Sequence, residues 1–232
     1  MTLGSPRMHH RRTDSTNLRA RELAAAGAPH GTLVTAAEQT AGRGRQGRTW
    51  TAPPNRALLM SLVLRDWPRL LPLAAAVAVA AVAGREAAIK WPNDVQLEGR
   101  KVAGILVEGR PREGWMVLGL GLNVAVRPED FPPELQQTAA TLGREPAGVE
   151  PALDELLTAL TAWLQASQED VLEAFRARDA LFEREVSWAH GTGVAQGIDA
   201  DGRLVVRTAT QTEHLDAGEV HLRPAQQGGG QH

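Results

Sequence analysis

Residues Ala57–Leu64 (ALLMSLVL) form an apolar run that is typical of a buried strand. The segment Thr32–Glu38 (TLVTAAE) predicts an earlier strand. Residues 40–50, which separate the two, lack an apolar period and contain three glycines, so they predict a loop. The run Leu70–Gly84 is mostly alanine, contains a proline and is too short to span a bilayer. It therefore predicts a tightly packed helix, from about Arg69 to Arg85, and no membrane segment.

Periodicity and turn residues predict the remaining elements of the larger, N-terminal part of the chain. The further helices expected are Asn17–Ala26, capped by Asp14 or Ser15, then Pro151–Gln165 and Glu169–Arg178. The further strands expected are Ala88–Trp91, Asp94–Leu97, Lys101–Glu108 and Trp115–Val126. Residues 127–150 are rich in proline and are expected to be irregular.

From Glu185 onward short β-like segments alternate with turns at 190–191, 199–202 and 216–218. This pattern predicts a small antiparallel barrel. The polar, glycine-rich end of the chain predicts disorder. The predicted division is a large domain over residues 1–182, a small domain over 183–224 and a disordered tail over 225–232.

The composition excludes several classes of site. The chain contains no cysteine, which excludes disulfides, thiol nucleophiles and cysteine-ligated zinc. Its formal net charge is −2, so no overall basic field is available to hold nucleic acid. The N-terminal residues MTLGSPRMHHRR lack the apolar run of a secretory signal, and we expect a cytoplasmic protein.

The loop Gly42–Arg48 (GRGRQGR) alternates three arginines with three glycines and is followed by Thr49 and Trp50. Glycine lets the backbone approach a ligand closely, and the planar guanidinium of arginine suits phosphate or carboxylate. The loop lacks the GK[ST] ending of a P-loop. A solvated loop or a non-specific nucleic-acid tether has the same composition. Its position between two apolar strands favours a functional loop.

Two lysines lie in motifs farther along the chain. Lys90 ends a buried-looking strand and opens the sequence KWPND, where an anionic ligand or an ion pair with Asp94 explains its position. Trp91 in the same motif is expected to be a core residue. Lys101 opens an apolar strand, and Gly104 within that strand leaves room for a ligand against the backbone.

The segment Gly119–Asn123 (GLGLN) alternates glycine with leucine, which makes one face of the predicted strand smooth. Such a face suits a flat ring, although close packing within a sheet explains the glycines equally well. Asn123 ends this face and is able to hydrogen-bond a ligand. The glycine pattern does not match a dinucleotide fingerprint.

The motifs taken together resemble the biotin–protein ligases over residues 14–126, and the C-terminal part resembles the small barrel of that family. The resemblance rests on DSTN at 14–17, Gln39, GRGRQGR, KWPND, KVAGIL at 101–106 and GLGLN, in this order. It implies an α+β fold: a class II synthetase-like catalytic domain with a mixed β-sheet and flanking helices, followed by an SH3-like barrel.

The resemblance also implies roles for individual residues. The biotin site would include Ser15, Thr16, Asn17 and Gln39, and Arg43, Gly44 and Arg45 would belong to the loop that covers biotin and its adenylate. Lys101 would meet the biotin carboxylate and phosphate oxygens. Lys90, Asn93 and Asp94 would lie on the phosphate and Mg²⁺ side, with Asp94 as the metal ligand. Gly104 and Asn123 would lie close to biotin and adenine, and Trp50 would stack on adenine.

The implied reaction uses biotin, ATP and Mg²⁺ to form biotinyl-5′-AMP, and then transfers biotin to a lysine of the biotin carboxyl carrier protein of acetyl-CoA carboxylase. Arg43, Arg45, Lys90 and Lys101 are the expected catalytic cations. The resemblance leaves open whether the protein is a monomer or a homodimer. DSTN begins so early that we expect no DNA-binding module and no repressor role, which a gel shift with operator-like DNA would test.

Three other functions remain open from the sequence. A lipoate ligase shares the fold and the adenylation chemistry, although DSTN and KWPND favour biotin. An RNA-binding module would account for the arginine–glycine loop, but the chain has no tyrosine, three phenylalanines and no basic excess. A catalytically silent biotin sensor is the third alternative.

Overall fold

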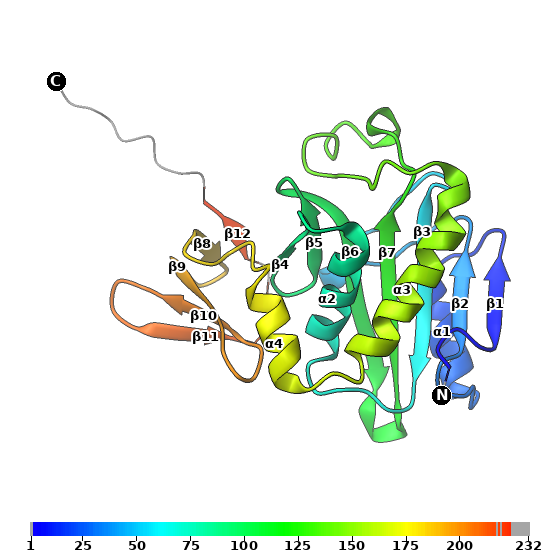
Figure 1. The fold of residues 1–232 in the computed structure, drawn as a ribbon, viewed down its shortest axis with the longest axis horizontal. Helices are drawn as coiled ribbons and strands as arrows, with labels where there is room; N and C mark the ends of the chain where they lie inside the picture. Colours follow the sequence, from blue (N-terminus) through cyan, green and yellow to red (C-terminus); the bar gives the residue numbers. More distant parts are fainter. Residues whose placement is uncertain (1, 217, 219, 224–232) are drawn as a thin grey trace.

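The computed structural model describes residues 2–216, 218 and 220–223. The predicted disordered tail, 225–232, lies outside the described residues. The larger part of the chain is built on a seven-stranded sheet with the order β1-β2-β3-β7-β6-β5-β4 (Figure 1). The strands are β1 (Arg7–His10), β2 (Leu33–Ala36), β3 (Ala57–Leu64), β4 (Ala88–Lys90), β5 (Asp94–Leu97), β6 (Arg100–Arg110) and β7 (Trp115–Asn123). Strands β1 and β2 are parallel and all other neighbours are antiparallel, so the predicted mixed sheet is confirmed.

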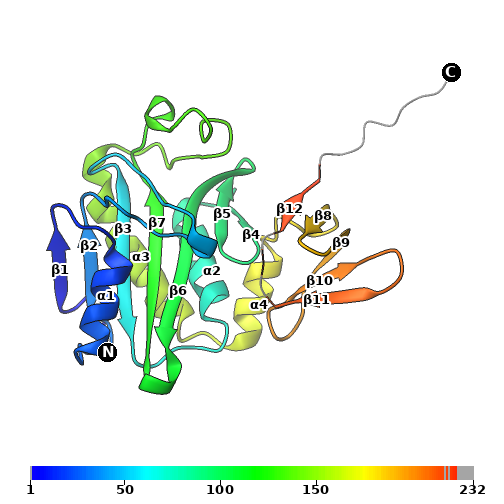
Figure 2. The same cartoon turned by 180° about the vertical axis from the view of Figure 1, so that it is seen from behind.

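Helices cover both faces of this sheet. Helices α2 (Leu71–Ala83), α3 (Val149–Trp163) and α4 (Gln168–Arg176) lie on one face (Figure 1), and α1 (Thr16–Ala25) lies on the other (Figure 2). Eight consecutive α2 residues, from Leu73 to Ala80, are alanine, valine or leucine and are buried. Their small side chains let α2 pack closely against the sheet and against α3. No helix among the described residues is long and apolar enough to cross a membrane.

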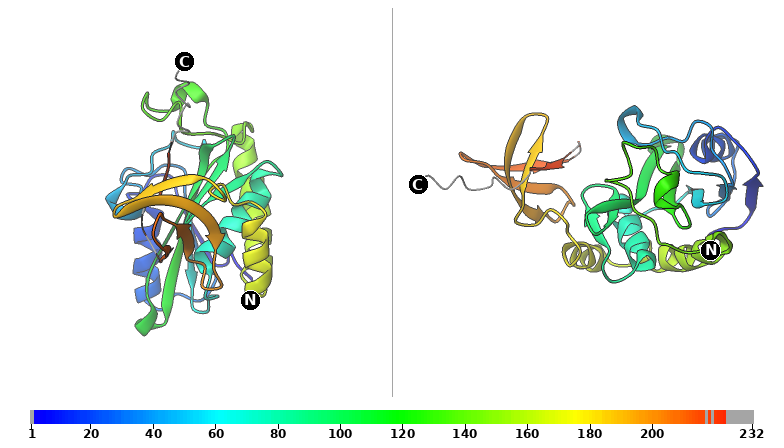
Figure 3. Two further views of the ribbon diagram at one scale, coloured as in Figure 1. Left: turned by 90° about the vertical axis from the view of Figure 1, so that its left-hand side faces the viewer. Right: turned by 90° about the horizontal axis from the view of Figure 1, so that it is seen from above.

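A second, five-stranded antiparallel sheet forms the C-terminal part, as the turn pattern predicts. Its strands are β8 (Glu185–Trp188), β9 (Gly191–Ile198), β10 (Leu204–Arg207), β11 (Thr212–Leu215) and β12 (His221–Leu222), in the order β11-β10-β9-β8-β12. This sheet lies at one end of the molecule, beyond β4 and α4 (Figure 3). The mixed sheet with helices and the small antiparallel sheet confirm the predicted fold class. The SH3-like description and the boundary after residue 182 stay predictions.

The two parts are packed against each other. Buried residues of the small sheet, such as Val186 and Leu204, belong to the same apolar cluster as the core of the large sheet. The indole Nε1 of Trp91 donates to the carbonyl oxygen of Gly202 at 3.0 Å, and Arg69 pairs with Asp201 at 2.6 Å. The small domain is therefore held directly against the KWPND segment. Trp91 is 2% exposed, which confirms its prediction as a core residue.

The structure differs from the sequence-based expectations in two places. Strand β1 was not predicted, because its sequence RMHH is polar and mostly exposed and carries no apolar alternation. Ser15 occupies the N-cap position of α1, but its side chain makes no capping hydrogen bond. Asp14 does not cap the helix either, since its carboxylate accepts from the Ser15 backbone N–H at 2.6 Å. The predicted capping function of these residues is therefore wrong, and the Ser15 hydroxyl is left for another partner.

Candidate active site

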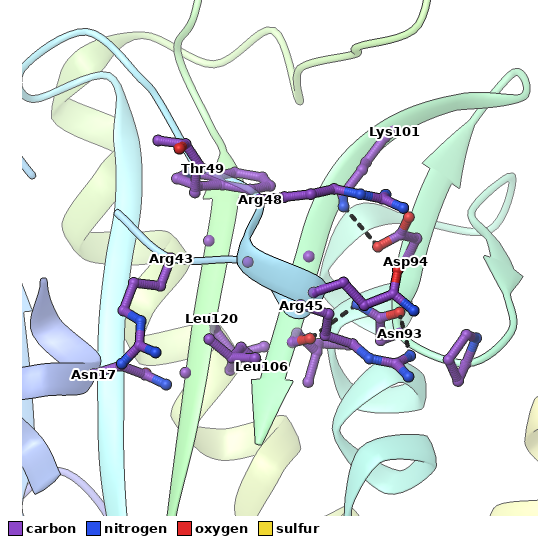
Figure 4. Close-up of a pocket in the computed structure, with 18 of the residues that line it drawn as sticks. Asn17, Arg43, Arg45, Arg48, Thr49, Asn93, Asp94, Lys101, Leu106 and Leu120 are labelled. Atoms are coloured by element: carbon purple, nitrogen blue, oxygen red, sulfur yellow. Dashed lines mark hydrogen bonds and ion pairs between the residues drawn. The ribbon is translucent and has the colours of Figure 1, made fainter. Parts of the chain in front are cut away.

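A pocket lies on the α1 face of the large sheet, over β6 and β7 and below the arginine–glycine loop (Figure 4). Thirteen of the residues predicted for the site line it together: Ser15, Thr16, Asn17, Gln39, Arg43, Gly44, Arg45, Trp50, Lys90, Asn93, Asp94, Lys101 and Gly104. They come from segments that are far apart in the sequence. The fold brings them together because β6 and β7 are neighbours in the sheet and α1 packs over β3 and β7 beside them.

One end of the pocket carries uncharged polar groups. The Gln39 Oε1 atom accepts from the Thr16 backbone N–H at 2.7 Å and lies 3.0 Å from the Thr16 hydroxyl. The Ser15 side chain is buried, and its Oγ atom has no hydrogen-bond partner among the described residues. A buried hydroxyl without a partner carries a desolvation cost, which a ligand with polar groups would remove. This end therefore suits a small polar head group.

The arginine–glycine loop closes over the pocket as a compact turn. The Gly44 N–H donates to the Arg48 carbonyl at 2.7 Å, and the Trp50 N–H donates to the Gly42 carbonyl at 2.9 Å. A Cβ atom at Gly42 would overlap the Trp50 carbonyl oxygen, so glycine is required there. Figure 4 shows Arg43 directed toward Asn17 at one end of the pocket. Arg45 extends to the other end, where its Nη1 donates to Asn93 Oδ1 at 3.0 Å.

The smooth glycine face of β7 holds a flat ring, and the ring is the chain's own Trp50. A Cβ atom at Gly121 would lie 2.5 Å from Trp50 Cε2, and one at Gly104 would lie 3.2 Å from Trp50 Cζ3. The indole Nε1 is buried and has no hydrogen-bond partner among the described residues. The expected flat-ring surface is thus present, and the stacking of Trp50 on adenine stays a prediction.

Substitution of Gly121 by alanine tests this packing. The added methyl group would displace the indole, so we expect the KM for ATP to rise roughly tenfold, the cost of a disturbed stacking contact of about 1.4 kcal/mol. Steady-state adenylation kinetics measure the effect. The control is Gly109→Ala, because Gly109 also lies at a tight position, but outside the pocket, in the neighbouring strand β6. Gly114 is not suitable as a control, since its positive φ would strain any alanine placed there. Equal ATP KM values for the Gly121 and Gly109 variants would contradict the prediction that Trp50, packed on Gly121, contacts adenine.

The pocket is also strongly cationic, above all at the end opposite Asn17. Among the described residues that line it, one carboxylate, that of Asp94, stands against five basic side chains: Arg43, Arg45, Arg48, Lys90 and Lys101. The two lysines are the only lysines in the sequence. Lys101 Nζ lies 2.6 Å from Asp94 Oδ1 and 5.7 Å from the centroid of the Trp50 ring. The sequence allowed an ion pair of Asp94 with Lys90, and the structure pairs Asp94 with Lys101.

Burial shifts the pKa values of two cations at this end of the pocket. It lowers the pKa of Lys90 below its usual value, Asp94 counteracts this in part, and the neighbouring cations add to the lowering. Burial likewise lowers the pKa of Arg45. Partly desolvated cations that face one another gain from the arrival of an anion. The site is therefore preorganised for a polyanionic ligand such as a nucleotide triphosphate.

Asn123 is the predicted site residue that does not line the pocket. It lies on the same face of β7 as Gly119 and Gly121, one step beyond the pocket, and is 3% exposed. Its Nδ2 donates to the Ala140 carbonyl at 2.9 Å, and its Oδ1 has no partner among the described residues. The segment 127–148, between β7 and α3, thus covers Asn123, and the expected irregular stretch ends two residues earlier than predicted because α3 begins at Val149. A contact with adenine stays a prediction.

Several residues near the pocket were not singled out from the sequence. Arg48 lines it, although its place in GRGRQGR could have identified it, and Gly218 and Val220 reach it from the small domain. Ser61 and Glu108 lie behind the lining and hydrogen-bond to lining residues. Their only signals were single polar residues at the middle and at the end of apolar strands. The described residues contain no group of three or more histidine, aspartate or glutamate side chains able to hold a metal ion.

Known proteins are similar to this chain in sequence and in fold. Residues 10–123 match the Biotin/lipoate A/B protein ligase family, and residues 191–223 match the Biotin protein ligase C terminal domain. The chain is 35% identical to the biotin–[acetyl-CoA-carboxylase] ligase of Mycobacterium tuberculosis, over 91% of this chain and 87% of that one. It is 36% identical to the ligase of the same name from Paracoccus denitrificans, over 90% of this chain and 97% of that one.

A solved structure agrees with these sequence matches. The fold is similar to that of the biotin protein ligase from Aquifex aeolicus in complex with biotin and ATP, with a TM-score of 0.82 and 26% identity over 94% of this chain and 99% of that one. The chain therefore belongs to the biotin/lipoate A/B protein ligase family, and its sequence and fold place it among the biotin protein ligases.

Proposed function

We propose that the chain joins biotin to a protein lysine in two steps, with ATP as the source of energy. In the first step a carboxylate oxygen of biotin attacks the α-phosphorus of ATP, and the bond to pyrophosphate breaks. In the second step the lysine amine attacks the acyl carbon of biotinyl-5′-AMP, loses a proton, and AMP leaves. The observation that carries this proposal is the pocket with five cations and one carboxylate beside an uncharged polar end.

The first step brings together two anions, so charge neutralisation is the main requirement. In the proposal Lys101 lies between the biotin carboxylate and the α-phosphate, and Arg43 and Arg45 cover them from the loop. Lys90 faces the phosphates from the end of β4, with Asn93 holding Arg45 in place. Preorganised cations stabilise the charge that spreads over the phosphate oxygens in the transition state. The mixed anhydride is prone to hydrolysis, and the loop that includes Gly44 shields it from water.

The uncharged end of the pocket is the proposed biotin site. Ser15, Thr16, Asn17 and Gln39 supply hydroxyl and amide groups, which match the donors and acceptor of a ureido ring. Gly104 leaves room for the ligand against β6, and Trp50 and Asn123 are proposed to contact adenine. The support for these roles is the shared pocket and, for Ser15, the buried hydroxyl without a partner.

Mg²⁺ belongs to the proposal as the companion of ATP. It is usually bound in proteins by one or two carboxylates together with phosphate oxygens and water. Asp94 is the only carboxylate among the lining residues that the structure describes, so it fits a site of this kind and would hold the ion. The ion would supply further charge neutralisation at the phosphates.

The acceptor is proposed to be the biotin carboxyl carrier protein of acetyl-CoA carboxylase, since the ligases from Mycobacterium tuberculosis and Paracoccus denitrificans are named for that carboxylase. The proposal includes a cytoplasmic location, because the reaction consumes ATP. The proposed oligomeric state is either a monomer or a homodimer.

The protonation of Lys90 predicts the pH dependence of adenylation. Its folded pKa is lowered, so the charged, active form is present at pH values below that pKa and is lost as the pH rises through it. We expect kcat/KM for ATP to fall on the alkaline side at a pH below the usual lysine value of about 10.4. The Lys90→Arg variant should move this fall to higher pH. A pH profile of pyrophosphate release measures both, and identical alkaline limbs would argue against a role for Lys90.

The overall function is tested by incubating the protein with ATP, Mg²⁺, biotin and a biotin carboxyl carrier domain. We expect one biotinyl group on the carrier, seen by mass spectrometry, and none when lipoate replaces biotin. Addition of lipoate instead would identify a lipoate ligase. Tight binding of biotin without transfer to the carrier would favour a sensor.

A further inference from the structure

A chain of polar side chains runs from the partly exposed Glu108 through buried residues to the uncharged end of the pocket. Glu108 Oε2 accepts from Asn17 Nδ2 at 3.0 Å. Asn17 Oδ1 lies 2.6 Å from the Ser61 hydroxyl, which lies 2.9 Å from the Thr16 hydroxyl. Ser61 is fully buried in β3, in the middle of an apolar strand. Neither Ser61 nor Glu108 lines the pocket, yet their partners Thr16 and Asn17 do.

The carboxylate at the end of this chain determines the direction of the hydrogen bonds that Asn17 and Ser61 donate. A carboxylate only accepts, so the Asn17 amide must turn its NH₂ group toward Glu108 and its oxygen toward Ser61. The amide oxygen only accepts, so the single Ser61 proton is donated to Asn17. Ser61 then has no proton for Thr16, whose own proton is donated either to Ser61 Oγ at 2.9 Å or to Gln39 Oε1 at 3.0 Å. Thr16 is left with lone pairs, and no proton, to offer the pocket.

The position of the Asn17 side chain depends on Gly119 of β7. A Cβ atom at Gly119 would overlap Asn17 Oδ1, so the absence of a side chain there makes room for the amide. The Gln39 oxygen accepts from the Thr16 backbone N–H and also lies 3.0 Å from the Thr16 hydroxyl, which leaves the Gln39 NH₂ group as a donor. This end of the pocket thus offers an acceptor at Thr16, a donor at Gln39 and the unpartnered hydroxyl of Ser15.

We propose that Glu108 is a positioning residue that, through Asn17, keeps Ser61 from donating to Thr16, so that the Thr16 lone pairs stay available to a ligand and the pocket selects a cyclic urea over a dithiolane. A cyclic urea presents N–H donors beside a carbonyl acceptor, which this arrangement complements. A dithiolane ring presents neither and would leave the buried polar groups unpaired, which is costly. The inference rests on the proposed function and explains how that pocket separates biotin from lipoate.

Glu108 also connects this network to the loop. The Arg43 guanidinium lies 3.3 Å from Glu108 Oε1, and Arg21 of α1 lies 3.4 Å from the same oxygen. One carboxylate therefore holds a loop residue and the head-group network at once. Arg21 does not line the pocket, so the Arg21→Gln variant removes a charged partner of Glu108 and leaves the chain from Glu108 to Thr16 intact.

The experiment is a calorimetric titration of biotin, desthiobiotin, lipoate and ATP into the wild-type protein and three variants. Glu108→Gln allows the Asn17 amide to turn over and the chain to reverse, so we expect biotin affinity to fall about tenfold, the size of one misdirected buried hydrogen bond. Desthiobiotin keeps the ureido ring, so its affinity should fall by the same factor, whereas the affinity for lipoate should not fall. Ser61→Ala removes the hydroxyl between Asn17 and Thr16. It should lower biotin affinity roughly threefold to tenfold and change ATP affinity less than about twofold.

The remaining outcomes separate the two proposals. Arg21→Gln should bind biotin as the wild type does, and thermal melts check that every variant is folded. If Glu108→Gln and Ser61→Ala are both folded and both bind biotin within twofold of the wild-type affinity, the proposed role of the network is wrong. Equal losses of biotin and ATP in Ser61→Ala overturn it as well, because a general distortion would then explain the effect. A wild-type protein that binds neither biotin nor desthiobiotin overturns the proposed function itself.

Discussion

Replacing Lys101 with methionine is expected to reduce kcat/KM for adenylation roughly 1000-fold, which corresponds to about 4 kcal/mol of lost transition-state stabilisation. Methionine has a similar length and no charge. The Lys101 ammonium lies 2.6 Å from Asp94, and its main-chain N–H donates to the Thr138 carbonyl at 2.7 Å. The backbone should therefore stay in place while the site loses a cation and leaves the Asp94 carboxylate unpaired, where it repels incoming phosphates.

The rate of biotin-dependent pyrophosphate release measures this effect. Arg100→Met is the matched control, because Arg100 is the preceding residue of β6 and its guanidinium pairs with Glu98 at 2.9 Å, outside the pocket. The control should keep its activity within about twofold, since exposed ion pairs contribute little. The double variant Lys101→Met with Asp94→Asn should recover part of the loss. Full activity in folded Lys101→Met would exclude Lys101 from the chemistry.

Replacing Arg45 with alanine is expected to release the intermediate from the enzyme. Arg45 connects the loop to the KWPND segment through its hydrogen bond to Asn93, and it is the basic residue of η1 (Arg45–Gly47) that lines the pocket. Without it the loop loses both a contact to the protein and a cation over the adenylate. We expect free biotinyl-5′-AMP to increase at least tenfold, the effect of losing one charge-assisted hydrogen bond of about 1.5–3 kcal/mol.

The measurement must detect biotinyl-5′-AMP that has left the enzyme. Its two lysines both line the pocket, so self-labelling would report poorly on escaped intermediate. An added lysine-rich bystander protein, analysed by mass spectrometry for biotinyl groups, traps it instead. Arg112→Ala, at an exposed position in the turn between β6 and β7, is the control and should label the bystander no more than the wild type does. Equal bystander labelling by Arg45→Ala and the control would refute the role of the loop as a cover.

The elements of the fold could be predicted where one face of a segment is buried. The apolar run of β3 and the alanine-rich α2 carry this pattern in the sequence, and both occur in the structure close to the expected bounds. Strand β1 could not be predicted, since its polar residues pair with β2 through backbone hydrogen bonds that leave no apolar period. The end of β7 lies at Asn123 rather than Val126, because the chain there turns toward the irregular segment.

The candidate site divides in the same way. The sequence alone determined which segments carry it, since glycine, arginine and lysine in GRGRQGR, KWPND and KVAGIL have few other uses in an apolar sheet. Only the tertiary structure decided what those segments contact: Trp50 lies on Gly121, Lys101 pairs with Asp94, and Asn123 is covered. It also joined Glu108 to Asn17, across 91 positions of the chain. The physical reason is that side-chain periodicity reports burial within one segment, whereas partners across a sheet depend on strand order and register, which local sequence does not encode.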